Sequence, residues 1–162
     1  MTTTDELLSA NESYADGFAH AGLAKEPARK VAVLTCMDAR LDVYRFLGLQ
    51  PGEAHVIRNA GGIVTEDAVR SLMISHRSLG TEELVVIQHT SCGMAGLDDD
   101  AYADEVEADT GTRPAVPLGG FDDLDASVRD SVTSLRGNPL IGHGSVRGFV
   151  YDVASGKLRE VT

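Results

Sequence analysis

Three short apolar runs, each followed by polar or glycine-rich residues, place the strongest constraint on the fold of this chain. The runs are VAVLT (31–35), AHVI (54–57) and LVVIQ (84–88). Apolar runs without polar alternation are typical of strands that are buried on both faces, as in a parallel sheet. A helical pattern over residues 65–80 separates the second run from the third. Because strands that alternate with helices form layered sheets, the sequence predicts an α/β fold with a mainly parallel central sheet flanked by helices.

The helix over residues 65–80 carries its own start and stop signals. Thr65 is suited to the N-cap position, and Gly80 is suited to the residue that follows the last helical turn. A second helix is predicted over residues 122–136, with Gly137 at its end. Both segments place apolar residues at helical spacing, which predicts that each helix packs one face on the sheet.

The remaining segments are predicted to be late strands and a surface insertion. Strands are expected around residues 140–142 and 146–153, and a turn at 155–157 precedes a short final strand. Residues 93–120 are first heavily acidic and then rich in proline and glycine, which predicts a solvated helix and a surface connection.

Composition and charge narrow the class of protein. The 162 residues are enough for a single domain, 1–162, and their 25 acidic residues against 14 basic ones give a net charge of -11. Such a surface repels nucleic acid, whose binding requires Lys and Arg to neutralise phosphates. No apolar run approaches the roughly 20 residues of a membrane span, and the acidic start does not resemble a signal peptide. We therefore expect a cytoplasmic protein, with no membrane partner and with reduced cysteines.

The polar residues that follow the three apolar runs are expected to gather at one edge of the sheet. They are CMDAR (36–40), RNAGG (58–62) and HTSCG (89–93). In open α/β sheets, ligands bind in the crevice beyond the carboxyl ends of the strands. If the strands are parallel, Cys36, His89 and Cys92 lie close together.

Two thiolates and an imidazole are ligands that zinc prefers. Three protein ligands leave a position for water, as in catalytic sites, whereas four make a structural site. The alternative is that Cys36 and Cys92 are simply small buried hydrophobic residues.

Asp38 and Arg40 favour the catalytic interpretation. Separated by one residue on the loop that carries Cys36, they are able to form an ion pair in which Arg40 orients the carboxylate. The carboxylate would then accept a hydrogen bond from water at the zinc. Two alternatives stay open: Asp38 as a fourth zinc ligand, and an ordinary surface salt bridge of little energetic value.

Taken together, the CMDAR, RNAGG and HTSCG motifs closely resemble those of a β-class carbonic anhydrase, in its compact bacterial branch. The resemblance is specific over residues 30–95 and looser toward the C-terminus. It implies a zinc enzyme that hydrates carbon dioxide reversibly to bicarbonate and a proton by means of a zinc-bound hydroxide. It also implies one Zn²⁺ per subunit, held by Cys36, His89 and Cys92, with Asp38 and Arg40 as the catalytic dyad.

The resemblance further implies a homodimer or a higher homo-oligomer, in which an N-terminal helical arm packs on a partner subunit. Residues 1–28 are the candidate arm, because 4–18 form an amphipathic helical pattern that begins near Thr4. A helix that packs in the core of its own subunit is the competing interpretation.

The chain departs from the family pattern at two points, and its motifs alone do not name the substrate. Ala39 stands where the commoner pattern has Ser, and the chain has no Trp with which to build the regulatory bicarbonate site of allosteric members. The compact branch also resembles hydrolases of carbonyl sulfide or carbon disulfide that use the same zinc site. A non-catalytic zinc-binding or sensing protein is the alternative from another class.

The other candidate residues are predicted to be mainly structural. His55 and His76 lie on a predicted strand and a predicted helix, and we expect neither to act in catalysis. His143 lies between two glycines and is either a proton relay or a loop residue without such a role. Gly61 and Gly62 follow a strand end, where they either let the backbone pass close to the site or simply turn the chain.

Overall fold

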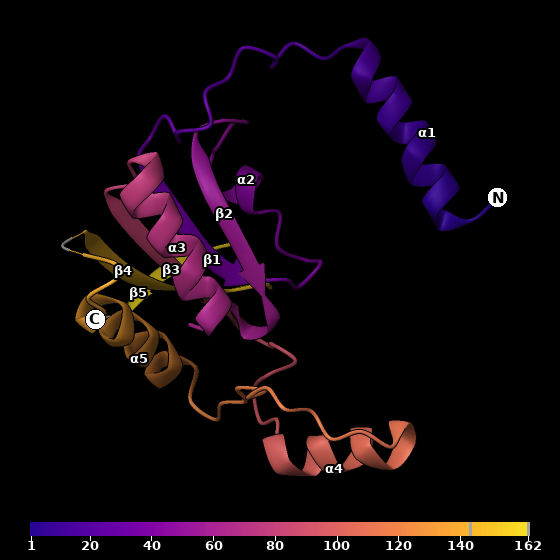
Figure 1. Ribbon diagram of the computed structural model, residues 1–162, viewed down its shortest axis with the longest axis vertical. Helices are drawn as coiled ribbons and strands as arrows, with labels where there is room; N and C mark the ends of the chain where they lie inside the picture. Colours follow the sequence, from indigo (N-terminus) through magenta and orange to yellow (C-terminus); the bar gives the residue numbers. More distant parts are fainter. Residues whose placement is uncertain (143, 162) are drawn as a thin grey trace.

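The computed structural model describes residues 1–142 and 144–161, which form a five-stranded sheet with helices on both faces (Figure 1). The strands are β1 (Val31–Cys36), β2 (Ala54–Asn59), β3 (Glu83–His89), β4 (Ser145–Tyr151) and β5 (Leu158–Val161). The helices are α1 (Thr3–Asp16), α2 (Val43–Phe46), α3 (Glu66–Leu79), α4 (Asp99–Thr110) and α5 (Leu124–Gly137), with a short 3-10 turn η1 (Ala60–Gly62) after β2.

The strand order is β2-β1-β3-β4-β5, and only β5 runs antiparallel to its neighbour. The predicted mainly parallel α/β sheet is therefore confirmed. From β1 the chain crosses to one side to form β2 and then to the other side to form β3. The carboxyl ends of β1 and β3 thus flank a topological switch point, which is where α/β sheets usually bind their ligands.

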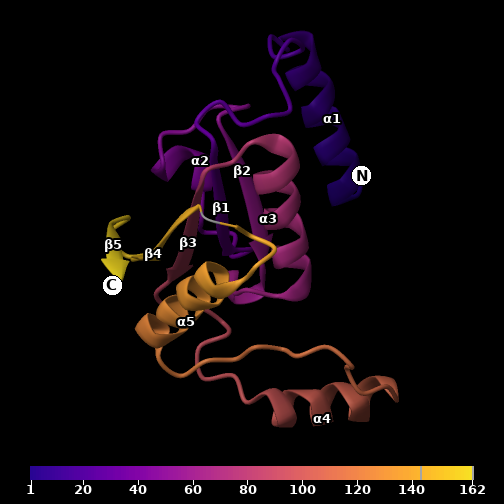
Figure 2. The ribbon, with the colours of Figure 1, turned by 60° about the vertical axis from the view of Figure 1, so that its left-hand side comes forward.

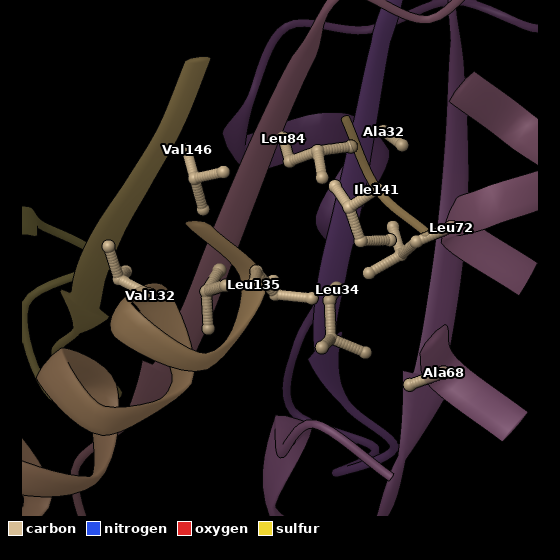
Figure 3. Close-up of a cluster of buried hydrophobic side chains, with 10 residues drawn as sticks. Ala32, Leu34, Ala68, Leu72, Leu84, Val132, Leu135, Ile141 and Val146 are labelled. Carbon is tan, nitrogen blue, oxygen red and sulfur yellow. The ribbon is translucent and has the colours of Figure 1, made fainter. Parts of the chain in front are cut away.

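One face of the sheet is covered by α3 and α5, and the main hydrophobic core lies beneath them (Figures 2 and 3). Leu34 and Leu84 from the strands meet Leu72 from α3 and Leu135 from α5, and all are almost completely buried. Burial of such a side chain stabilises the fold by about 1.5–3 kcal/mol relative to its exposure. This core fixes the strands whose ends carry the polar motifs.

The opposite face carries the short helix α2 and a second apolar cluster. Phe46 stacks on Tyr151 with ring centroids 4.4 Å apart. The same cluster contains Cys36 and Cys92, both buried, together with Ile87. The two cysteines therefore pack against apolar side chains on this face of the sheet.

The α3 helix begins and ends where the sequence predicted. The Thr65 side chain accepts a hydrogen bond from the backbone N–H of Ala68, and Gly80 adopts a left-handed conformation after the last turn. For α5, Asp123 provides the N-cap and Gly137 is the last helical residue. The helix predicted over 122–136 therefore forms, shifted by one or two residues.

Two helices extend away from the sheet (Figures 1 and 2). The α1 helix has no buried residue, so the interpretation as a core helix of its own subunit is wrong for this chain. The helix begins at Thr3, close to the predicted start near Thr4, and its N-cap Thr2 forms a reciprocal capping box with Asp5. The predicted solvated helix within 93–120 is α4, which is followed by an irregular connection.

Two strand predictions need correction. Residues 140–142 do not form a strand, because the chain turns there with a backbone hydrogen bond from Ile141 to Asn138. Ile141 is fully buried, which explains why the segment has the apolar character of a strand. The β2 strand is only partly buried, since it lies at the sheet edge with a single neighbour. Across residues 1–142 and 144–161, no helix combines the length and apolar character needed to span a bilayer.

Candidate metal centre

Three ligand-type side chains converge beyond the ends of β1 and β3. Cys36 is the last residue of β1, His89 is the last residue of β3, and Cys92 follows on the next turn. Their ligating atoms all lie within 4.8 Å of one another, and the two sulfur atoms are 4.0 Å apart. The predicted convergence of residues 56 positions apart is therefore confirmed.

The imidazole of His89 is oriented for metal binding through Nε2. Its Nδ1–H donates to the carbonyl oxygen of Thr90 at 2.9 Å, so Nε2 carries the free lone pair. The side chain is fully buried, and Nε2 has no hydrogen-bond partner in the part of the chain that the structure describes. A buried nitrogen without a partner, beside two sulfur atoms, fits a soft divalent cation such as zinc.

Electrostatics around the two thiols favours a cation at this position. Burial raises the pKa of Cys36, but His89 and nearby backbone N–H groups outweigh it and lower that pKa to about 7. Burial and the proximity of Cys36 raise the pKa of Cys92. Because like charges at this separation oppose each other, a divalent cation would stabilise both thiolates at once.

Asp38 and Arg40 form the predicted pair. The Nε of Arg40 donates to Oδ1 of Asp38 at 2.9 Å and Nη2 donates to Oδ2 at 2.7 Å, while the Arg40 backbone N–H also donates to Oδ1. These hydrogen bonds hold the pKa of the Asp38 carboxyl well below its usual range. Oδ2 lies 3.7 Å from Nε2 of His89, so the carboxylate borders the cluster of ligating atoms.

The turn after β3 connects the dyad to the metal ligands. Ser91 adopts a left-handed conformation with φ of 54°, and its carbonyl oxygen accepts a hydrogen bond from Nη2 of Arg40 at 2.9 Å. Cys92 is the next residue, so any movement of this turn affects both a candidate ligand and the clamp on Asp38. This contact could not be predicted from the sequence, because it involves a backbone oxygen.

Gly62 allows η1 to pass directly against the end of β1. It has φ of +63°, and a Cβ at this position would lie 2.8 Å from the backbone nitrogen of Cys36. Of the two interpretations of the glycines, close passage beside the site is therefore confirmed for Gly62. No bulkier residue fits without moving the strand end.

The side chains of His55 and His76 both make hydrogen bonds within the fold, as expected of structural residues. His55 contacts Ser75, and His76 contacts the carbonyl oxygen of Thr81. His143 lies outside the described residues. One buried residue was not anticipated: the side-chain amide of Gln88, next to His89, has no hydrogen-bond partner within residues 1–142 and 144–161.

Comparison with known proteins agrees with this geometry. A carbonic anhydrase family model matches residues 31–114. Beta-carbonic anhydrase 1 of Mycobacterium tuberculosis is 49% identical, covering 100% of this chain and 99% of the relative. A carbonic anhydrase crystal structure from Streptococcus mutans superposes with a TM-score of 0.94 at 40% identity, covering 100% of this chain and 99% of the other.

A second group of relatives has a different name. A carbon disulfide hydrolase of an Acidianus species is 35% identical, covering 82% of this chain and 77% of the relative. The motifs at the strand ends, the switch-point site and the full-length match to beta-carbonic anhydrase 1 lead to one conclusion. The chain belongs to the β-carbonic anhydrase family.

Proposed function

We propose that the protein is a carbonic anhydrase that hydrates carbon dioxide reversibly to bicarbonate and a proton. Cys36, His89 and Cys92 are the proposed zinc ligands, and Asp38 and Arg40 are the proposed catalytic pair. The observation that carries the proposal is the buried Nε2 of His89, which has no partner among the described residues and belongs to a cluster with both cysteine sulfurs.

Cys36, His89 and Cys92 would hold the zinc, whose chemistry would be to lower the pKa of water to about 7 and so supply a nucleophile near neutral pH. The role of the protein is to orient that water. The Asp38 carboxylate borders the ligand cluster and accepts hydrogen bonds only, because its low pKa keeps it ionised. It would accept a hydrogen bond from the attacking water and so direct the oxygen lone pair toward the carbon of the substrate.

The Arg40 contacts support the catalytic interpretation over a closed site with Asp38 as a fourth ligand. Both Asp38 oxygens accept hydrogen bonds from the guanidinium, which is itself anchored on the Ser91 carbonyl. To enter the coordination sphere, the carboxylate would have to give up this bidentate pair. A purely structural zinc site, or a zinc-sensing one, needs no such clamp.

Hydrolysis of carbon disulfide or carbonyl sulfide is the second candidate activity. It is favoured by the 35% identity to the carbon disulfide hydrolase of an Acidianus species. The same ligands and the same carboxylate would serve either reaction, since the water attacks the central carbon of a linear substrate in both. The greater identity to a carbonic anhydrase, 49%, supports carbon dioxide as the main substrate.

Stopped-flow measurement of carbon dioxide hydration and of hydrogen sulfide release, on one zinc-loaded sample at two pH values, separates these candidates. Asp38→Asn should retain zinc and lose about 10²–10⁴-fold in hydration rate, the range typical for a group that handles a proton in the transition state. Undiminished turnover in this variant would exclude the proposed role of Asp38. Negligible turnover of either substrate by the unaltered protein would favour the non-catalytic zinc-binding alternative.

We also propose that the single domain, 1–162, works as a homodimer or higher homo-oligomer in the cytoplasm, without nucleic-acid or membrane partners. The N-terminal arm, residues 1–28, supports this assembly. Its large apolar side chains are exposed in the isolated chain, with Leu7 at 66% and Phe18 at 49%. Exposed apolar groups on a projecting helix are typical of a surface that a partner covers.

The arm is tested by the mass of the assembly in solution. Leu7→Asp should shift the protein to a smaller species in sedimentation velocity. Burying an unpaired charge at the interface costs free energy and would weaken the association of subunits. Ser9→Asp adds the same charge about 200° around the helix from Leu7 and serves as the matched control. Identical sedimentation of both variants with the unaltered protein would argue against docking of the arm through Leu7.

A further inference from the structure

Arg58 makes two hydrogen bonds to the loop that carries the proposed ligand and the proposed catalytic carboxylate. It lies near the end of β2, opposite Thr35 in the register of the parallel pair β1–β2. Its Nε donates to the carbonyl oxygen of Cys36 at 2.9 Å, and its Nη2 donates to the carbonyl oxygen of Asp38 at 2.7 Å. One planar group therefore joins the backbone of both residues.

Further along the loop, Leu41 is buried in the second apolar cluster and Arg40 donates to the Ser91 carbonyl oxygen. Regular structure ends with Cys36 and resumes at α2, so the segment between them depends on individual contacts. The Met37 side chain, between the two carbonyls, is 66% exposed and therefore supplies little packing. The backbone N–H of Met37 donates to the Asn59 carbonyl at 2.8 Å, again on β2. The end of β2 thus supplies backbone contacts to Cys36, Met37 and Asp38, the part of the loop that lies nearest the cluster of ligating atoms.

The form of the Arg58 contact explains why a guanidinium is used. Two N–H groups at a fixed separation hold two carbonyl oxygens at a fixed separation, which a single ammonium on a flexible stem does not do. Both partners are main-chain oxygens, so the contact constrains the backbone rather than neutralising a charge. The spacing between Cys36 and Asp38 follows from this constraint.

We propose that Arg58 is a positioning residue that fixes the Asp38 carboxylate relative to the metal ligand Cys36. The inference rests on the proposed function, because it assigns a purpose to the geometry of those two residues. Arg58 does not touch the reacting atoms. It acts through the two carbonyl groups, and misplacement of a catalytic group by about 1 Å is enough to cost on the order of 10²-fold in rate.

Arg58→Ala and Arg58→Lys test the proposal, with Arg147→Ala as the matched control. Arg147 also donates two side-chain hydrogen bonds, both to Glu160 and both 2.7 Å long. These bonds join β4 to β5, and β3 separates β4 from β1, whose end carries the Asp38–Arg40 pair. Each variant is measured for zinc content, for the kcat of hydration, for urea stability and, after cobalt substitution, for its visible absorption spectrum.

Arg58→Ala should keep its metal, lose about 10–100-fold in kcat and show an altered cobalt spectrum. Arg58→Lys should recover little of the kcat, since it restores the charge but not the two N–H donors at a fixed separation. Arg147→Ala should change stability alone. If Arg58→Ala does not fold, Arg58→Lys and Arg58→Gln provide the same comparison.

Several results would overturn the inference. They are an unchanged kcat and cobalt spectrum in Arg58→Ala, full recovery by Arg58→Lys, and losses that match those of Arg147→Ala at equal stability. These outcomes differ from failure of the proposed function, in which the unaltered protein itself would lack metal or hydration activity.

Discussion

Gly62→Ala tests the close approach on which the geometry of the site depends. The residue has φ of +63°, and an added Cβ would lie 2.8 Å from the Cys36 nitrogen, 2.9 Å from the Thr35 carbonyl carbon and 3.0 Å from the Ile87 oxygen. The left-handed conformation costs an L-residue roughly 1–2 kcal/mol. Overpacking against backbone atoms, which do not rotate away, typically adds about 1–3 kcal/mol.

Gly80→Ala is the matched control for the conformational part of this cost. Gly80 has φ of +72°, but an added Cβ there would meet no atom within 4 Å. Gly80→Ala should therefore cost only the conformational penalty of roughly 1–2 kcal/mol. The difference between the two variants isolates the contact with the end of β1.

Urea unfolding at one protein concentration, together with zinc analysis, measures both effects. Gly62→Ala should be less stable than Gly80→Ala by about 1–3 kcal/mol and should lose zinc, because the strand end that carries Cys36 has to move. Gly80→Ala should retain zinc. Equal stability and equal zinc content in the two variants would refute the claim that η1 passes directly against the end of β1.

Two further predictions concern stability. The bidentate hydrogen bonds from Arg159 lower the pKa of the Asp125 carboxyl in the folded chain. The pair should therefore stabilise the fold at pH values above the unfolded pKa of about 3.9. This contribution should be lost as the pH falls through the lower pKa of the folded state. Urea titrations of the unaltered protein and Asp125→Asn should therefore differ at pH 7 and converge toward pH 2, and an equal gap at both pH values would contradict the pairing. Gln88→Leu should stabilise the protein by about 1–3 kcal/mol, since the buried amide has no partner among the described residues, and a destabilised variant would reveal an interaction of that amide.

Much of the fold follows from local features of the sequence. The apolar runs at β1 and β3 are long enough and continuous enough to indicate buried parallel strands, and both form as expected. Thr65 and Gly80 mark the ends of α3 because capping depends on one or two residues only. The convergence of Cys36 with His89 then follows from topology, since parallel strands end at the same edge.

Other features depend on neighbours that are distant in sequence. The apolar residues of 140–142 are buried in a turn, because burial alone does not distinguish a strand from a packed loop. Exposure of α1 could not be separated from core packing, since an amphipathic pattern is the same whether the partner is the same chain or another. Arg58 was visible as part of a motif, but its contact with two carbonyls required the register of β2 on β1.

The site itself divides in the same way. Residue types and strand-end positions were enough to propose the ligands and the Asp38–Arg40 pair. The tautomer of His89 depends on the Thr90 carbonyl, and the anchor of Arg40 is the Ser91 carbonyl. Backbone oxygens carry no residue-specific signal, so these contacts become visible only in three dimensions.

Zinc analysis of the purified protein and of Cys92→Ser, with carbon dioxide hydration measured on the same samples, tests the central claim most directly. The unaltered protein should hold one zinc per chain and be active, whereas Cys92→Ser should lose both metal and activity because a thiolate ligand is missing. Ser91→Gly, which keeps the left-handed turn beside Cys92, is the control and should retain zinc. Full zinc occupancy in Cys92→Ser, or metal-free unaltered protein after zinc loading, would contradict the account.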